Sequence, residues 1–190
     1  MIKIFLLTHP REVAKVTNTG RLVTQAISAG NSENVSAQVL LWSRTEPDPL
    51  LLSSIETAST LLLYPSEEAL SALPAGGPCK VEYPLLNNQP DTAQYPVADA
   101  CNFIILDGTW QQARKIYNKS PYLKNLHKLH LVTQTQSRYT LRRNQKSSGL
   151  CTAESVIELL KLKGCFNCAE DLDNLYQQIL IRMQVGNNRV

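Results

Sequence analysis

Hydrophobic residues along this chain form short runs, and these runs alternate with segments in which apolar positions recur at helical spacing. The short runs predict buried strands, because a strand that is covered on both faces needs apolar side chains at nearly every position. Four predicted strands are strong, at Ile2–Thr8 and residues 35–42, 60–64 and 102–106. Two are weaker, at residues 129–132 and 139–141.

Helices are predicted between these strands, where capping and helix-breaking residues mark their ends. The first follows the capping candidates Thr17 to Gly20, and another is opened by Pro65. The remaining predicted helices lie at residues 50–57, 110–118, 152–162 and 169–184, and Thr152 is the predicted cap of the helix that ends at Leu162. Residues 74–100 hold five prolines and two adjacent glycines and are predicted to form a long surface loop. The alternation predicts an α/β domain, a mostly parallel sheet flanked by helices. A length of 190 residues suits one domain, 1–190.

Composition argues against several classes of protein. No apolar run reaches the roughly 18 residues that a membrane helix needs. Residues 1–7 are too short for a signal-peptide core and contain no small-residue cleavage site, so we expect a cytoplasmic protein without a membrane partner. Five cysteines, an odd number, suit reduced thiols, and Cys165 with Cys168 has no second pair to complete a zinc site. We therefore assign no metal.

Charge is unevenly distributed along the chain. Residues 1–107 hold 6 basic and 11 acidic side chains, whereas residues 108–146 hold 9 basic side chains and no acidic one. A solvated basic face is the ordinary interpretation of such a segment. A segment without any acid in an otherwise mildly acidic chain is also what a phosphate-facing surface requires. The distribution therefore favours nucleic acid or another polyanion as the partner.

Three segments that follow predicted strands carry unusual residues: Tyr64-Pro65-Ser66, Asp107-Gly108-Thr109-Trp110 and Leu150-Cys151-Thr152. In a parallel sheet such segments meet at the carboxyl ends of the strands, where ligands bind, so we expect them to form one pocket. The sequence has no Gly-x-Gly-x-x-Gly, no P-loop and no Gly-x-Ser-x-Gly. These absences argue against a dinucleotide, a P-loop nucleotide and a serine hydrolase.

Asp107 and Trp110 each allow two interpretations from local sequence. Asp107 stands between a strand and a helix, where an aspartate is commonly a helix cap. Trp110 could be a core residue, although a large and partly polar ring at a helix start also suits ligand stacking. His9 is interpreted as structural.

Four motifs, in order, resemble the DTW-domain family, which is named after the residues that stand here as Asp107, Thr109 and Trp110. The central motif runs from Leu106 to Lys115. The opening motif comprises His9-Pro10-Arg11-Glu12 and Thr17-Asn18-Thr19-Gly20; the second comprises Leu62-Leu63-Tyr64-Pro65 with Glu67 and Ala69; the last comprises Tyr139-Thr140-Leu141-Arg142 and Leu150-Cys151-Thr152-Ala153-Glu154. Together they span about residues 6–160.

The sequence departs from the family pattern in two places. The opening motif is not preceded by the cysteine-rich, zinc-binding segment of longer members, so the resemblance is to a short form. Cys151 stands where the family usually has serine. We expect this change to be tolerated if the loop binds through its backbone.

The resemblance implies a tRNA-uridine 3-amino-3-carboxypropyltransferase with a SPOUT-like sheet whose carboxyl end is knotted. S-adenosylmethionine would be the co-substrate, uridine N3 would attack its methionine Cγ, and methylthioadenosine would leave without help from a metal. Asp107 would be the base, and Thr109 and Trp110 would steer the transferred arm. The resemblance assigns the donor to Leu63, Tyr64, Pro65, Ser66, Leu106, Gly108, Leu150, Cys151 and Thr152. For tRNA, the candidates are Arg114, Lys115, Arg138, Tyr139, Arg142, Arg143 and Lys146.

Two other functions fit the same sequence. One is an S-adenosylmethionine-dependent RNA methyltransferase on the same scaffold. The other is a non-catalytic RNA-binding protein that uses only the basic segment. Asp107 together with Trp110 favours an enzyme over the latter.

Overall fold

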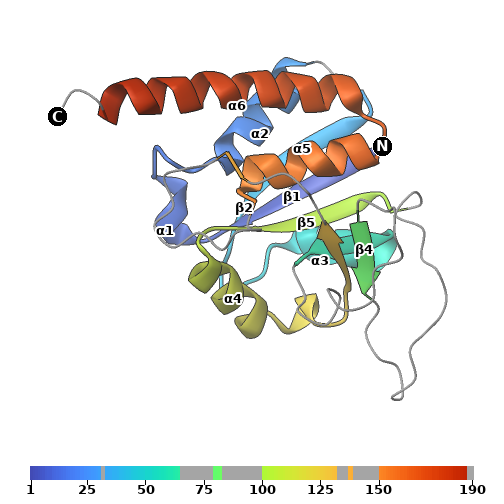
Figure 1. Ribbon diagram of the computed structural model, residues 1–190. Coiled ribbons are helices and arrows are strands. Elements are labelled where there is room, and N and C mark those ends of the chain that lie inside the picture. Colours follow the sequence, from blue (N-terminus) through green and yellow to red (C-terminus); the bar gives the residue numbers. More distant parts are fainter. Residues whose placement is uncertain (31–32, 65–78, 83–99, 132–136, 139–149, 188–190) are drawn as a thin grey trace.

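A six-stranded sheet runs through the computed structural model and positions its other elements (Figure 1). The structure describes residues 1–30, 33–64, 79–82, 100–131, 137–138 and 150–187, with the backbone alone for 79–82 and 183–187. The spatial order of the strands is β2 (Val35–Leu41), β1 (Ile2–Thr8), β5 (Asn102–Asp107), β3 (Thr60–Leu63), β6 (His127–Leu131) and β4 (Cys79–Glu82). The first five are parallel, and β4 pairs with β6 in the antiparallel direction.

Register within the sheet brings distant polar residues together. Strand β5 lies between β1 and β3, and its last residue, Asp107, is the direct neighbour of Thr8, the last residue of β1. Both strands therefore end at the same level on the same edge of the sheet. A ligand site at this edge would receive residues from both strands.

Helices cover both faces of the sheet, as Figure 1 shows. On one face lie α2 (Gly20–Ala29), α5 (Thr152–Leu162) and α6 (Phe166–Asn187), which pack with inward residues such as Ile4 and Phe103. On the other lie α3 (Pro49–Thr57) and α4 (Trp110–Lys119), against the alternate residues Phe5 and Ile104. Two short elements complete the fold: α1 (Pro10–Val13) and the 3-10 helix η2 (Pro121–Leu123). This three-layer arrangement confirms the α/β prediction.

Some element predictions need correction. Residues 79–82, predicted as part of a loop, form β4; this edge strand alternates Cys-Lys-Val-Glu and lacks an apolar run. Helix α6 begins at Phe166, three residues before the predicted start. The cap of α5 is Cys151, and Thr152 is its first helical residue.

Several predictions fall outside the described residues. They are the helix opened by Pro65, the strand at 139–141, and the knot, whose path would include the chain between β6 and α5. The knotted carboxyl end therefore stays a prediction. Within the described ranges, no helix is long and apolar enough to cross a membrane.

Candidate active site

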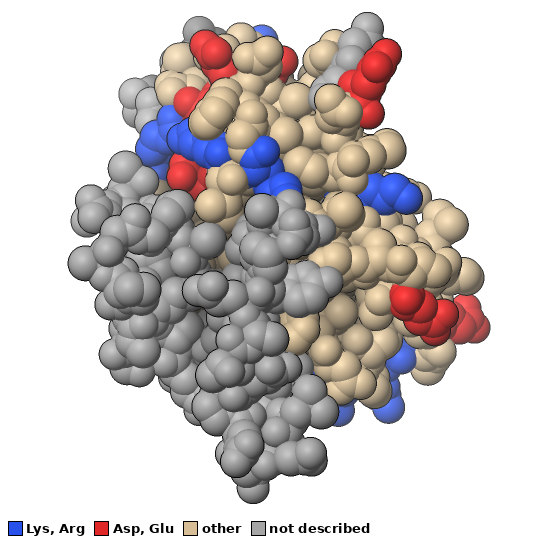
Figure 2. Space-filling model, turned by 90° about the vertical axis from the view of Figure 1, so that its right-hand side faces the viewer, with Lys and Arg blue, Asp and Glu red and all other residues tan. Residues whose placement is uncertain are grey.

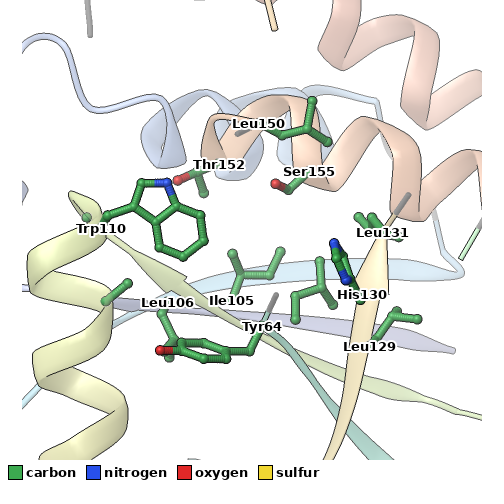
Figure 3. A pocket seen from close by; sticks show the side chains of 13 residues that line it. Tyr64, Ile105, Leu106, Trp110, Leu129, His130, Leu131, Leu150, Thr152 and Ser155 are labelled. Atoms are coloured by element: carbon green, nitrogen blue, oxygen red, sulfur yellow. The ribbon is translucent and has the colours of Figure 1, made fainter. Parts of the chain in front are cut away.

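A pocket lies at the carboxyl ends of β3, β5 and β6, between the starts of α4 and α5 (Figure 3). Its walls are mainly apolar and aromatic, with a few polar groups. The lining residues are Leu63, Tyr64, Ile105, Leu106, Gly108, Trp110, Ala113, Leu129, His130, Leu131, Leu150, Thr152 and Ser155. In Figure 3, the indole of Trp110 and the side chain of Thr152 lie toward one end, and His130 lies toward the other. An apolar pocket with a few convergent polar groups is typical of small-molecule sites.

The three segments singled out in the sequence meet at this pocket. Five of their residues line it, Tyr64, Gly108, Trp110, Leu150 and Thr152, together with the preceding residues Leu63 and Leu106. Pro65 and Ser66 lie outside the described residues. Asp107, Thr109 and Cys151 belong to the same segments but do not line the pocket, so the segments meet there through part of their described residues.

Cys151 does not line the pocket. Its Sγ is buried and donates a hydrogen bond of 3.5 Å to the hydroxyl of Tyr176, which is itself fully buried. Burial, and then the charge of Glu154, raise the pKa of the Cys151 thiol. The thiol is thus a packed group and not an activated nucleophile.

Asp107 stands between two residues that line the pocket, Leu106 and Gly108, and is only 3% exposed. Its Oδ2 lies 3.0 Å from Oγ1 of Thr8 and accepts a hydrogen bond of 2.8 Å from Nδ2 of Asn18. Its Oδ1 accepts a hydrogen bond of 2.7 Å from Oγ1 of Thr152. Both carboxylate oxygens are therefore occupied, and Asp107 is not among the residues that line the pocket.

The helix-cap interpretation of Asp107 is wrong, because α4 is capped by Thr109. The Thr109 hydroxyl accepts a hydrogen bond from the backbone N–H of Gln112 at 3.3 Å. The Gln112 side chain in turn accepts one from the Thr109 backbone N–H at 2.6 Å. This reciprocal pair is a capping box.

The Asp107 carboxylate joins four segments: the ends of β1 and β5, the loop before α2, and the start of α5. Asn18 extends this network, since its side-chain oxygen accepts a hydrogen bond of 2.7 Å from the N–H of Gly20. Thr152 belongs both to the network and to the pocket wall. The network thereby fixes one wall of the pocket.

Gly20 provides a test of how tightly this network is packed. A Cβ at Gly20 would lie 2.8 Å from Oδ2 of Asp107, closer than real Cβ contacts. We expect Gly20→Ala to lower the free energy of unfolding by about 1–3 kcal/mol, as overpacking typically does. Urea denaturation of the purified protein measures this change.

Gly30 provides the matched control at the other end of α2. A Cβ there would meet chiefly the end of the exposed Asp171 side chain, at 3.1 Å. Gly30→Ala should therefore change stability by less than about 0.5 kcal/mol, as surface substitutions usually do. Equal effects of the two substitutions would contradict the packing argument.

Glu154 is a second buried carboxylate, which the sequence analysis missed as a contact residue. It is 5% exposed, and it accepts hydrogen bonds from the backbone N–H of Cys151 at 2.9 Å, from Oγ of Ser137 at 2.5 Å and from the N–H of Arg138 at 2.6 Å. The spacing of Cys151 and Glu154, three residues apart before an apolar run, is the available sequence signal. Glu154 ties the start of α5 to residues 137–138.

Arg138, a predicted tRNA contact, is engaged within the protein. Its guanidinium pairs with the carboxylate of Asp173 in α6 and lies 5.4 Å from the ring centroid of Tyr176. The hydrogen bond to Asp173 raises the pKa of Arg138. Burial tends to raise the pKa of Asp173, but hydrogen bonds from Arg138 and Gln177, with the Arg138 charge, lower it overall. This pair connects residues 137–138 to α6.

The other predicted tRNA contacts divide into two groups. Arg114 and Lys115 are exposed on α4, and Lys115 Nζ lies 5.9 Å from the Trp42 ring centroid. Tyr139, Arg142, Arg143 and Lys146 lie outside the described residues. His9 has a structural position: its Nδ1 accepts a hydrogen bond from the N–H of Arg11 at 3.2 Å, and its ring stacks on Trp42.

A pair of stacked aromatic rings connects the pocket to the surface of α4. The rings of Tyr64 and Tyr117 are 4.5 Å apart at their centroids, with an interplanar angle of 23°. Burial raises the pKa of Tyr64, while the charges of Arg114 and Lys128 oppose this effect. Tyr117 and Lys128 were not singled out in the sequence, because their contact with Tyr64 depends on the fold.

Together, the fold and the pocket define an α/β domain with a ligand site at the carboxyl ends of its parallel strands. Among the described residues, no three His, Cys, Asp or Glu side chains gather as a metal site would require. The family model of the DTW domain matches residues 1–184, and the chain belongs to the DTW domain family.

The chain is also similar to curated proteins named tRNA-uridine aminocarboxypropyltransferase 2. It is 26% identical to the one from Macaca fascicularis over 179 residues, which cover 94% of this chain and 51% of the relative. The Drosophila melanogaster protein is 25% identical over 158 residues (83% and 55%), and that of Mus musculus 24% over 168 residues (88% and 50%). The chain thus spans about half the length of these relatives. No solved structure matches the chain.

Proposed function

We propose that this protein transfers the 3-amino-3-carboxypropyl group from S-adenosylmethionine to N3 of a uridine in tRNA. Membership of the DTW family and the names of the similar proteins support a tRNA-uridine aminocarboxypropyltransferase. The observation that carries the proposal is the convergence of the family's motif residues, Leu63, Gly108, Trp110 and Thr152 among them, on one pocket.

The reaction is an in-line displacement. Uridine N3 forms a bond to the methionine Cγ, the Cγ–S bond breaks, and its electron pair stays on the sulfur of methylthioadenosine. The N3 proton passes to a base or to solvent. Because the sulfonium already makes Cγ electrophilic, the protein's main tasks are to align the two substrates and to assist proton removal.

The pocket suits the donor's adenosine. Its apolar wall, formed by residues such as Leu63, Leu129 and Leu150, and the ring of Trp110 can pack against the faces of adenine. Thr152, Ser155 and His130 supply polar atoms along the same walls. The start of α4 lies beside this pocket, and its dipole favours the carboxylate of the transferred arm.

Two roles are open to Asp107 in this reaction. As a base, following the family resemblance, it would take the N3 proton. As an anchor, it would hold Thr152 and the ends of β1 and β5 in position, a role supported by its burial and its contacts with Thr8, Asn18 and Thr152. The two roles predict different results for Asp107→Asn.

The purified protein is incubated with unmodified tRNA and S-adenosylmethionine. The proposal predicts that methylthioadenosine is released and that the tRNA gains an equal amount of modified uridine. Chromatography of the small molecules and mass spectrometry of the digested tRNA measure both products. Release of S-adenosylhomocysteine would instead support the methyltransferase alternative. Binding of tRNA without either product would support the non-catalytic alternative.

A further inference from the structure

Two lysines surround one tyrosine ring beside the pocket. Nζ of Lys124 lies 3.4 Å from the ring centroid of Tyr117, and Nζ of Lys128 lies 5.4 Å from it. These three residues, here called the lysine–tyrosine cluster, come from α4, from the turn after η2 and from β6. The fold therefore assembles the cluster from three separate elements.

The cluster is connected to the pocket through stacked rings. Tyr117 stacks on Tyr64, which lines the pocket. Because the space between two stacked rings cannot hold an ammonium group, Lys124 lies on the face of Tyr117 that is turned away from Tyr64. The order from the pocket outward is therefore Tyr64, Tyr117 and Lys124. A nucleotide in the pocket and its immediate neighbour in the RNA chain together span this short distance.

Lys124 is held in place before any ligand binds. Its Nζ donates a hydrogen bond of 3.3 Å to Oδ1 of Asn118, in addition to its contact with the Tyr117 ring. A lysine held in this way loses less side-chain freedom when it binds an anion. This favours a specific contact over a freely moving surface charge.

Among the residues whose side chains the structure describes, neither lysine has a carboxylate partner; Glu82, the neighbour of Lys128 on β4, is described by its backbone alone. The ion pairs found there involve Lys15, Arg138 and Lys161, but neither Lys124 nor Lys128. Burial, and then the charge of Lys128, lower the pKa of Lys124, as expected for two nearby cations. An anion placed against both ammonium groups would relieve this repulsion.

On the face shown in Figure 2, most of the described surface is uncharged, and the few Lys and Arg residues lie near Asp and Glu in several places. Residues 108–131, which include the lysine–tyrosine cluster, contain five basic side chains and no acidic one. A polyanion is the partner that fits such a surface next to a nucleotide pocket.

We propose that Lys124 and Lys128 bind the phosphate backbone of the tRNA next to the uridine that enters the pocket. This inference rests on the proposed function for the identity of the RNA. Phosphate contacts set the position of a nucleic acid without reading its sequence. The cluster would thus fix the approach of the backbone, while the pocket selects the uridine.

The test is tRNA binding at several salt concentrations, without S-adenosylmethionine, for Lys124→Gln, Lys128→Gln and the double variant. Each lost phosphate contact should reduce the slope of log affinity against log salt by about 0.7–0.9. Affinity near physiological salt should fall several-fold per lysine. In the transfer assay KM for tRNA should rise, with kcat nearly unchanged.

Two sets of variants serve as controls. Lys161→Gln removes an exposed lysine near the distal end of α5 and should leave the slope unchanged. Lys124→Arg and Lys128→Arg keep the charge and should keep the wild-type slope. If the Arg variants lose as much affinity as the Gln variants, the lysines are structural and the inference is overturned.

The binding assay separates this inference from the proposed function. If the wild type binds tRNA but releases no methylthioadenosine, the proposed function fails while the slope still tests the cluster. If the Gln variants bind tRNA with the wild-type slope and affinity, the inference is overturned even if transfer occurs. Unchanged RNA binding is also the result expected if the lysines contact another protein.

Discussion

Asp107→Ala is expected to lower the free energy of unfolding by about 2–4 kcal/mol and to abolish transfer. The substitution removes the acceptor for Asn18 and Thr152, whose polar groups would remain buried near an empty space. Each buried polar group left without a partner costs about 1–3 kcal/mol. The wall of the pocket that contains Thr152 would also lose its support. Urea denaturation and the methylthioadenosine assay measure the two effects.

Asp107→Asn separates the anchor from the base. An asparagine oxygen in place of Oδ2 can still accept from Asn18 and Thr8, and its amide can donate to the hydroxyl of Thr152, which is able to accept. We therefore expect a loss of stability below about 1 kcal/mol, less than when a buried polar group loses its partner. Because the geometry favours the anchor, transfer should stay within about tenfold of wild type, a smaller loss than removal of a general base gives.

If Asp107 is the base, Asp107→Asn should instead lower the rate of transfer strongly. Positioned proton transfer is typically worth about 10²–10⁴-fold, so a fall of two orders of magnitude at unchanged stability and affinity would support Asp107 as the base. Thr152→Val is the matched variant, because it removes the hydroxyl that joins Asp107 to the pocket wall and nearly keeps the shape. The anchor role predicts a larger loss of transfer in Thr152→Val than in Asp107→Asn, and the base role predicts the reverse.

The apolar runs were sufficient to predict the central strands, because strands buried on both faces leave a continuous signal in the sequence. Strand β4 escaped prediction, since Cys79–Glu82 is short, half charged and at the edge of the sheet. The cap of α4 could have been found, because Thr109 and Gln112 have the spacing of a capping box. This spacing indicates that Thr109, and not Asp107, is the cap of α4, as the structure shows.

The surroundings of Asp107 could not be predicted from the sequence. Thr8 and Asn18 are 99 and 89 residues away from it in the chain, and Thr152 is 45 residues away. No periodicity relates such positions, which meet only because β1 and β5 pair in register and α5 begins above them. Sequence motifs identified several of the residues, but only the fold shows which of them contact each other.

The contacts of the charged residues in the basic segment could not be predicted from the sequence either. The composition of this segment predicted a polyanion surface along residues 108–146, and the tRNA contacts predicted there included Arg138 but neither Lys124 nor Lys128. The fold distinguishes them: Arg138 pairs with Asp173, which lies 35 residues further along the chain, whereas Lys124 and Lys128 gather on Tyr117. A count of charges contains no information about partners that distant.

Trp110→Ala is expected to weaken binding of S-adenosylmethionine and methylthioadenosine by about ten- to a hundredfold. Trp110 is 40% exposed and lines the pocket, where its indole projects from the start of α4 (Figure 3). Stacking of an aromatic side chain on a base is worth about 1–3 kcal/mol, which corresponds to this range of affinity. Stability should fall by about 1–2 kcal/mol, less than for a fully buried aromatic side chain, because part of Trp110 is already in contact with water. Calorimetry with methylthioadenosine measures the affinity directly.

Phe166→Ala is the matched control for this prediction. Phe166 is also an exposed aromatic residue (65%) at the first position of a helix, α6, but it does not line the pocket. Its removal should leave affinity for methylthioadenosine unchanged, while Trp110→Phe should retain more of that affinity than Trp110→Ala. If Trp110→Ala binds methylthioadenosine as tightly as wild type, adenosine does not pack on this wall. The donor must then be placed elsewhere, because Trp110 is the largest side chain that the described pocket offers to a nucleoside.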